Sequence, residues 1–345
     1  MANLFKEGLQ VTELATTQKS APNPDTDSGI FTRARTVLRS KVGNMGVFGA
    51  LVLVMLVSAL VSPQFLTMPN LLNVIQQIAI VGILALGMTF VIITSGIDLS
   101  VGATLALASV LSASMVNQFG IFAGILITVA VGALVGFING SGVVLGGIPP
   151  FVMTLAVMAI VTGVAFIYSG GMPVAVKSSA FIQLGVGRLF GIPIPAICYV
   201  VLAIICSFIL RRTVFGRSVY AVGSNVEAAR LSGVSVGQTT ILVYVIGSIM
   251  ASIGGMLYTA QLASGSATAG GTISLDVIAA VVIGGTSLFG GIGIISGTFI
   301  GSAILGVLSN ILNLAGVHTY VQEIAKGLII IGAILIQLQL SKKAK

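Results

Sequence analysis

The sequence predicts an all-α, polytopic membrane protein. Hydrophobic residues make up 56% of the chain and charged residues only 7%, whereas a soluble domain carries about 25% charged residues. The mean hydropathy is +1.14, and apolar runs long enough to cross a bilayer recur along most of the chain. Prolines fall at or outside the ends of these runs, where helices start and stop. The composition therefore excludes a soluble domain.

Apolar runs of roughly 20 residues, the length that a membrane helix needs, predict about ten transmembrane helices. The runs cover residues 46–62, 71–93, 98–116, 119–142, 149–169, 194–211, 238–262, 274–289, 293–314 and 319–339. The chain then divides into a transmembrane domain at 46–340, a flexible cytoplasmic tail at 1–45 and a basic C-terminal tail at 341–345. The longer tail ends in a basic anchor of Arg33, Arg35, Arg39 and Lys41.

Basic residues predict the orientation of the chain in the membrane. Four of them follow the sixth run, namely Arg211, Arg212, Arg217 and Arg230. The predicted opposite side holds Lys177 and Arg188. Because cytoplasmic loops carry the excess of Lys and Arg, both termini are predicted to be cytoplasmic. The basic clusters lie at the edges of apolar runs without interleaved aromatic residues, so we expect no nucleic acid partner.

The polar stretch 211–237 predicts a short amphipathic helix on the cytoplasmic side. Ser224 or Asn225 can cap it, Glu227 suits its first turn, and Gly233 can end it. Its apolar face would suit a groove in a partner and consists of Val226, Ala229 and Val234. The alternative is a plain loop whose charges only orient the chain.

A second polar stretch, at 94–102, lies between the second and third runs. Asp98 is costly near hydrocarbon, which makes it a candidate substrate acceptor, ion ligand or structural clamp. The alternative is that Asp98 caps a helix that starts at Leu99, with Ser100 beside it at the membrane edge. These roles do not exclude one another.

Glycines crowd the stretch 284–293, which does not fit an ordinary helix interior. Transporters use re-entrant turns and broken helices where backbone lines a cavity, and this stretch predicts such a geometry. The alternative is a close helix crossing, which Gly293, Gly297 and Gly301 also allow.

Enzyme motifs are missing from the sequence. We find no nucleotide-binding loop of the form G-x-x-x-x-G-K-S/T and no credible Ser/His/Asp or paired-carboxylate site. One His and two Cys, without a cluster of either residue, do not suit a structural zinc or iron site. We therefore predict no catalytic residue, no metal site and no enzyme activity in this chain.

Three motifs together resemble the permease subunits of bacterial ribose-type ABC importers. They are TSGIDLSVG at 94–102, GRSVYAVGSNVEAARLSGV at 216–234 and LDVIAAVVIGGTSLFGG at 275–291. The resemblance covers about residues 46–340 and includes PQFLTMPNLLNVIQQ before the second run. The tail at 1–45 lies outside it.

This resemblance implies a multi-pass permease domain at 46–340 in the bacterial inner membrane, moving a monosaccharide such as ribose into the cytoplasm. It also implies a second permease subunit, with a homodimer expected, two cytoplasmic ATPase domains and an extracytoplasmic sugar-binding protein. The ATP would be bound by the partner, so the chain itself would carry no cofactor.

By the same resemblance, the helix at about 223–234 would be the coupling helix that contacts the ATPase. The residues implied are Gly223, Asn225, Glu227, Ala228, Ala229, Arg230 and Gly233. Candidates for the substrate path are polar residues in apolar surroundings, namely Thr94, Asp98, Ser100, Asp276, Thr286, Ser287, Asn310 and Asn313. A path almost free of charge suits a neutral sugar, which needs hydrogen-bond partners and no counter-ion.

Two other functions compete with this interpretation. An ion-coupled secondary sugar transporter would usually show embedded carboxylates paired with cations. Here only Asp98, Asp276, Glu323 and Lys326 are available, and the last two, three residues apart on one helix, are predicted to pair. A membrane anchor or assembly subunit would have no transport path. The polar helix after the sixth run favours the ATPase-coupled permease over both.

Overall fold

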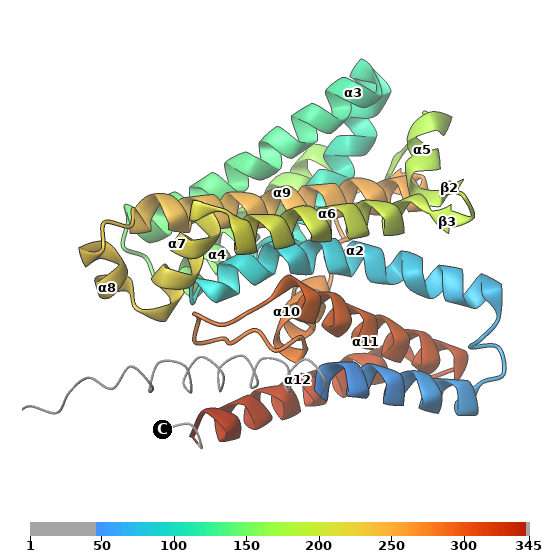
Figure 1. Cartoon of the computed structure of the whole chain (residues 1–345). Helices are drawn as coiled ribbons and strands as arrows, with labels where there is room; N and C mark the ends of the chain where they lie inside the picture. Colours follow the sequence, from blue (N-terminus) through green and yellow to red (C-terminus); the bar gives the residue numbers. More distant parts are fainter. Residues whose placement is uncertain (1–45, 343–345) are drawn as a thin grey trace, which may run out of the picture. The chain divides into compact units, whose positions relative to one another are not determined.

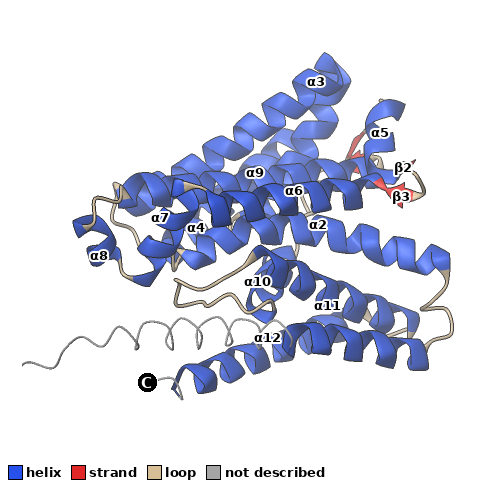
Figure 2. Cartoon of the chain, in the orientation of Figure 1, coloured by secondary structure: helices blue, strands red, loops and turns tan. Residues whose placement is uncertain are grey.

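The computed structural model describes residues 46–342, so the predictions for the tail at 1–45 and for residues 343–345 lie outside it. The described part is mostly helical (Figures 1 and 2). Its helices are Gly46–Val61, α2 Met68–Ile93, α3 Val101–Val144, α4 Pro150–Ser169, α5 Ser179–Val186, α6 Ile194–Arg212, α7 Val214–Ser224, α8 Val226–Leu231, α9 Val236–Leu262, α10 Ile273–Ile283, α11 Ile295–Leu314 and α12 Thr319–Lys342.

Four short strands form two antiparallel pairs within the described residues. β1 (Val174–Ala175) pairs with β4 (Ser264–Gly265), and β2 (Arg188–Leu189) pairs with β3 (Ile192–Pro193). Each strand has two residues, so these pairs tie loops together and leave the helices to form the core.

Within residues 46–342, six helices are long and apolar enough to cross a membrane, namely α2, α3, α4, α6, α9 and α11. The prediction of a full span at 274–289 is wrong, because α10 has only 11 residues. At 1.5 Å per residue it is about 16 Å long, whereas the hydrocarbon core is about 30 Å thick. The cause is the glycine-rich sequence after Ile283, which ends the helix.

Proline positions explain several helix starts. α2, α4 and α6 each carry a proline in the first two helical positions. Proline lacks an N–H and has a helical φ, so it is well suited to the first turn, where the N–H groups have no partner within the helix. The predicted use of proline as helix punctuation is confirmed at these three starts.

The long helix α3 is a hairpin of two arms. Gly120 breaks it with φ +82° and ψ 173°, which is not helical. The amide of Asn139 on the second arm donates to the Ser100 hydroxyl, just before the first arm, at 2.8 Å. The predicted runs 98–116 and 119–142 therefore correspond to the two arms.

Helices α7 and α8 lie at one end of the helical domain, while α5, β2 and β3 lie at the opposite end (Figure 1). We name these the α8 end and the α5 end. The loop at 284–294 reaches towards the α8 end, and α12 runs from the α5 end towards the α8 end (Figure 1).

The core is built around α2, which is the most buried of the six long helices. Side chains such as Ile83, Leu84 and Phe90 have no exposed surface. Glycines on the second arm of α3 let it approach α9 closely, because an added Cβ on Gly140 would lie 2.6 Å from the Ile241 Cα atom. Small residues at four-residue spacing commonly pack membrane helices in this way.

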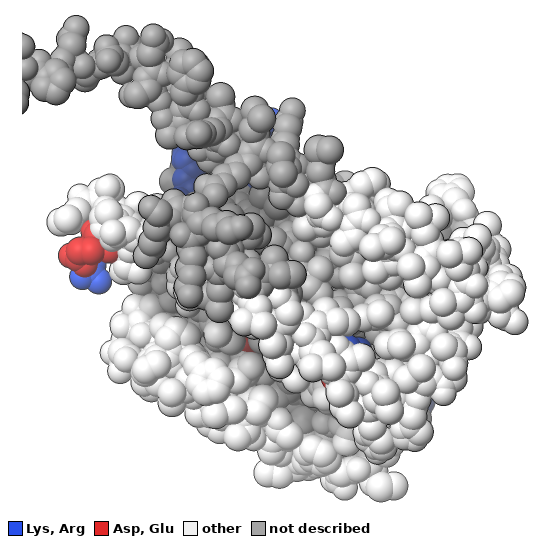
Figure 3. Space-filling view, turned by 90° about the horizontal axis from the view of Figure 1, so that it is seen from below, with Lys and Arg blue, Asp and Glu red and all other residues white. Residues whose placement is uncertain are grey.

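The surface of the described residues is largely apolar. Large hydrophobic side chains such as Phe122 (84% exposed) and Ile167 (84% exposed) face outwards. On the face drawn in Figure 3, the visible charged atoms gather mainly at the edge where α8 lies. An apolar surface of this kind suits lipid, because lipid chains need no polar partners.

Candidate functional site

The helix predicted in the polar stretch 211–237 is confirmed as α8. Asn225 caps it by accepting a hydrogen bond from the Ala228 amide at 2.9 Å. Glu227 lies in the first turn, where a negative charge stabilises the helix dipole. Gly233 follows the helix with φ +80°, a conformation that glycine adopts without strain. The local sequence alone therefore determines where α8 starts and stops.

The predicted apolar face of α8 is only partly available to a partner. Ala229 is 4% exposed and packs against the protein, which corrects the expectation that it faces a groove. Val226 is 45% exposed and Leu231 is 83% exposed. Glu227 and Arg230 form an exposed ion pair of 3.4 Å beside them. The outer surface of α8 thus combines two apolar side chains with a charged pair.

A helix that the sequence did not predict, α7, precedes α8. Thr213 caps it by accepting from the Gly216 amide at 3.0 Å. From α7, the Tyr220 hydroxyl donates to the Gly293 carbonyl at 2.6 Å. Burial raises the pKa of the Tyr220 phenol above its ordinary value, and nearby Arg211 opposes this only partly. The phenol therefore keeps its proton and remains a donor.

The glycine-rich stretch is a broken helix, as one alternative predicted. After α10 the chain turns through Gly285, Gly290 and Gly291, all with φ between +72° and +87°. The Gly291 amide donates to the Ile93 carbonyl at 2.9 Å, and the Ser95 hydroxyl donates to the Phe289 carbonyl at 3.0 Å. The loop is thus fastened to the end of α2.

The close helix crossing, which was the other alternative, is also present. A Cβ atom on Gly297 would overlap the Gly284 carbonyl, and one on Gly301 would overlap the Ala280 carbonyl. α10 and α11 therefore touch backbone to backbone directly beside the loop. The broken helix and the close crossing are therefore both present, while the idea that this backbone lines a cavity stays a prediction.

Asp98 closes a turn before α3. Its Oδ1 accepts from the Ser100 amide at 2.8 Å and from the Ser100 hydroxyl at 2.6 Å, and the residue is 1% exposed. The helix starts at Val101 with Ser100 as N-cap, so the predicted start at Leu99 is two residues too early. Asp98 stabilises the turn that leads into the helix, and the cap position itself belongs to Ser100.

A cavity of about 560 Å³ lies at the α8 end. Thr94 from the loop after α2, Val226 and Arg230 from α8, and Thr240 and Tyr244 from α9 contribute to its lining. Of the substrate-path candidates, Thr94 borders this cavity. Asp98 and Ser100 follow Thr94 closely along the chain, but their side chains are buried.

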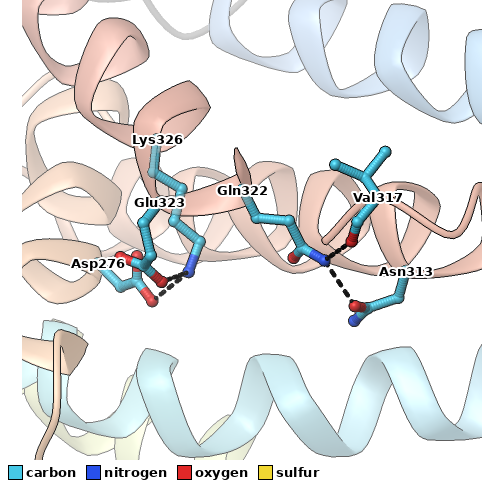
Figure 4. Close-up of polar contacts among 6 residues, drawn as sticks. All are labelled: Asp276, Asn313, Val317, Gln322, Glu323 and Lys326. Atoms are coloured by element: carbon cyan, nitrogen blue, oxygen red, sulfur yellow. Dashed lines mark hydrogen bonds and ion pairs between the residues drawn. The ribbon is translucent and has the colours of Figure 1, made fainter. Parts of the chain in front are cut away.

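Asp276 belongs to an ion cluster between α10 and α12. The Lys326 ammonium lies 2.9 Å from an Asp276 oxygen and 3.3 Å from a Glu323 oxygen (Figure 4). The predicted Glu323–Lys326 pair is confirmed, but the shorter contact is the one to Asp276. The Asp276 and Lys326 side chains are 18% and 14% exposed. Charge pairing therefore ties the two helices together.

The remaining substrate-path candidates lie in two places. Asn310 exchanges two hydrogen bonds with Asn70, at 3.0 and 2.8 Å, and Asn313 accepts from Gln322 at 2.8 Å (Figure 4). Thr286 and Ser287 lie in the loop after α10, where the Ser287 hydroxyl accepts from the Phe289 amide at 3.2 Å. The structure thus does not bring all substrate-path candidates together, because they lie in separate groups along the length of the helices.

Comparison with known proteins agrees with this architecture. Residues 70–336 match the family model described as branched-chain amino acid transport system / permease component. The ribose import permease protein RbsC of Escherichia coli K12 is 43% identical over 291 residues, which cover 83% of this chain and 90% of the relative. The chain therefore belongs to the permease family that this model describes, the permease component of branched-chain amino acid transport systems. The Bacillus subtilis RbsC is 41% identical to the permease over 295 residues, covering 85% of this chain and 92% of the relative.

A more distant relative is also a transporter permease. The L-arabinose ABC transporter permease protein AraH of Azospirillum brasilense is 32% identical to the permease over 319 residues, covering 92% of this chain and 94% of the relative. No solved structure matches the permease.

Within residues 46–342, no group of three His, Cys, Asp or Glu side chains could hold a metal ion. The permease is a multi-pass subunit of a transport system.

Sequence reasoning missed Tyr220, Ser95 and Asn139 as contact residues. Tyr220 and its acceptor Gly293 are 73 residues apart, and Asn139 lies 39 residues from Ser100. No local pattern connects residues so distant in the chain. The glycines of the loop were the available signal, because they indicate where backbones approach closely.

Proposed function

We propose that the permease is the translocation subunit of an ATP-driven importer that moves a monosaccharide, ribose or a similar sugar, into the cytoplasm. The observation that carries the proposal is α8, a short, capped helix that presents Val226 and Leu231 at one end of a membrane domain. An amphipathic helix of this kind fits a groove in a partner protein. The printed names of the relatives support the choice of sugar.

We also propose that the α8 end faces the cytoplasm. Arg211, Arg212, Arg217 and Arg230 lie there, whereas Lys177 and Arg188 lie in the segments around α5. An excess of Lys and Arg marks the cytoplasmic side. The domain at 46–340 then has about ten membrane segments in the inner membrane, of which α10 is too short to be a full span by itself. The tails at 1–45 and 341–345 would then be cytoplasmic.

In this proposal α8 and its flanks, at about 223–234, form the coupling helix. Val226 and Leu231 enter a groove of a cytoplasmic ATPase, which binds the ATP. Gly223, Asn225, Ala228, Ala229 and Gly233 shape the helix and its ends, while Glu227 and Arg230 provide charged contacts at the rim. Closure of two ATPase domains would push on α8 in each of two permease subunits, and rocking of the helices would give alternating access.

The substrate path proposed here is sparse. Thr94, Asp98, Ser100, Thr286 and Ser287 would offer hydrogen bonds at the α8 end. Asn310 and Asn313 would do so near the α5 end, with Asp276 between the two groups. An extracytoplasmic sugar-binding protein would supply most of the affinity and selectivity. A path that held the sugar tightly would not release it.

The energy source of uptake tests the proposal. The permease is reconstituted in proteoliposomes with a candidate ATPase subunit and binding protein, and uptake of labelled ribose is measured with ATP inside. We expect uptake that requires ATP and the loaded binding protein and that persists when ionophores collapse proton and sodium gradients. Uptake that stops with the ionophores would instead indicate an ion-coupled transporter.

A further inference from the structure

The loop at 284–294 joins the proposed coupling elements to the last membrane helices. We propose that this loop and α7 move as one unit, so that the loop transmits the displacement of α8 to α10 and α11. Tyr220 is the positioning residue that holds the loop to α7. This inference rests on the proposed function of α8 and adds a second route from α8, besides the direct connection through α9.

Hydrogen bonds hold the loop at three points. The Tyr220 hydroxyl donates to the Gly293 carbonyl at 2.6 Å. The Gly291 amide donates to the Ile93 carbonyl at 2.9 Å. The Ser95 hydroxyl donates to the Phe289 carbonyl at 3.0 Å. The first bond comes from α7 and the other two involve the end of α2, so the loop is fixed between these helices.

Close backbone contact leaves no space for the loop and α7 to slide past each other. A Cβ atom on Gly223 would overlap the Ile93 carbonyl oxygen and lie 2.7 Å from the Gly291 nitrogen. A Cβ atom on Gly291 would lie 2.7 Å from the Ser224 hydroxyl oxygen. Packed interfaces of this density switch between discrete arrangements rather than deform continuously. A push on α7 therefore reaches the loop directly.

The loop passes this push on because both of its ends continue into helices. α10 ends at Ile283 and α11 begins at Ile295, and their backbones touch where Gly284 meets Gly297. From α10, the Asp276–Lys326 ion pair continues to α12. The chain of contacts thus runs from α7 to the three last helices of the described domain.

The variant Tyr220→Phe tests this inference, because it keeps the ring and removes the hydroxyl. In the reconstituted system we expect ATP hydrolysis to continue, while the number of sugars imported per ATP falls about fivefold. That factor corresponds to the loss of one hydrogen bond of about 1 kcal/mol. The matched control is Tyr320→Phe at the α5 end, where Tyr320 is 76% exposed. The control should leave the ratio unchanged.

A disulfide across the contact between α7 and the loop tests whether loss of this contact is what lowers the sugar-to-ATP ratio. A Cβ atom on Gly291 would lie 3.4 Å from the Ser224 Cβ atom, close to the 3.5–4.5 Å typical of disulfides. A cysteine at Gly291 is strained because φ is +72° there, but the oxidised and reduced forms of one protein carry the same strain, so comparing them isolates the effect of the bond. We therefore add Ser224→Cys and Gly291→Cys to Tyr220→Phe, in a background where the free Cys198 and Cys206 are replaced by Ala. Oxidation should restore the sugar-to-ATP ratio, and reduction of the same protein should abolish the rescue.

Two results would overturn the inference. One is a Tyr220→Phe permease with the wild-type sugar-to-ATP ratio. The other is a disulfide that forms but lowers the ratio further, which would mean that α7 and the loop must separate during transport. If the wild-type permease itself shows no ATP-dependent uptake, the proposed function fails instead, and the two failures are thereby distinguished.

Discussion

Asp98 and Asp276 are both carboxylates in apolar surroundings, but different partners hold them. Asp98 accepts from the amide and hydroxyl of Ser100, two residues further along the chain. Asp276 pairs with Lys326, 50 residues away on another helix. The first contact shapes a local turn, and the second fastens two helices together. Polarity alone made the two residues equivalent substrate-path candidates, whereas their partners give them different structural tasks.

The largest effect is expected at the Asp276–Lys326 pair. Asp276→Ala or Lys326→Met leaves the other charge in a mostly buried place without its closest partner. Leaving a buried charge unpaired costs about 3–5 kcal/mol. Lys326→Met should approach this cost because it leaves two carboxylates without a cation, whereas Asp276→Ala should cost less because Lys326 keeps Glu323 at 3.3 Å. The midpoint of thermal unfolding in detergent should fall strongly for each single variant.

The double variant Asp276→Ala/Lys326→Met is the matched control, because it removes both charges of the closer pair and leaves only the more exposed Glu323 without its partner. It should be more stable than the sum of the single losses predicts. Additive losses would contradict the view that the pair fastens α10 to α12, and would indicate that each residue contributes independently.

A smaller effect is expected at Asp98. Asp98→Asn keeps an oxygen that can accept from the Ser100 amide, so the turn should survive with a loss of about 1 kcal/mol. Asp98→Leu removes the acceptor and should cost about 1–3 kcal/mol. Uptake by the Asn variant should remain close to wild type if the carboxylate only closes the turn. A large loss of uptake in a normally stable Asn variant would show that the carboxylate itself contacts the sugar.

The smallest effect on stability is expected at Glu227, whose ion pair with Arg230 is exposed. Exposed pairs of this type contribute about 0.5 kcal/mol. Glu227→Gln should therefore leave the thermal midpoint almost unchanged. A large drop would mean that α8 is held by this pair rather than by its Asn225 cap and by burial of Ala229.

Local sequence rules predicted most features that depend on neighbouring residues, with α7 and its Thr213 cap as the exception. Asn225 begins α8 and Gly233 ends it. Pro150 marks the start of α4, and the glycines near 284–293 end α10. These features arise within one or two turns of chain, so residue types and spacing suffice to locate them.

Long-range contacts could not be predicted in the same way. The Tyr220–Gly293, Asn70–Asn310 and Asp276–Lys326 contacts join segments that only the folded arrangement brings together. The length of α10 was also overestimated, because apolar residues continue to Phe289 although the glycines have already ended the helix. A single sequence shows which residues are polar, but not which ones meet.

The central claim, that ATP hydrolysis drives sugar uptake through α8, is tested by measuring both quantities in the same proteoliposomes. We compare the wild-type permease with Glu227→Trp and Gly233→Trp, using inserted and stable protein in each case. The account predicts that ATP hydrolysis persists in the variants while uptake falls to background. Normal uptake by both variants would contradict the assignment of α8 as the coupling helix.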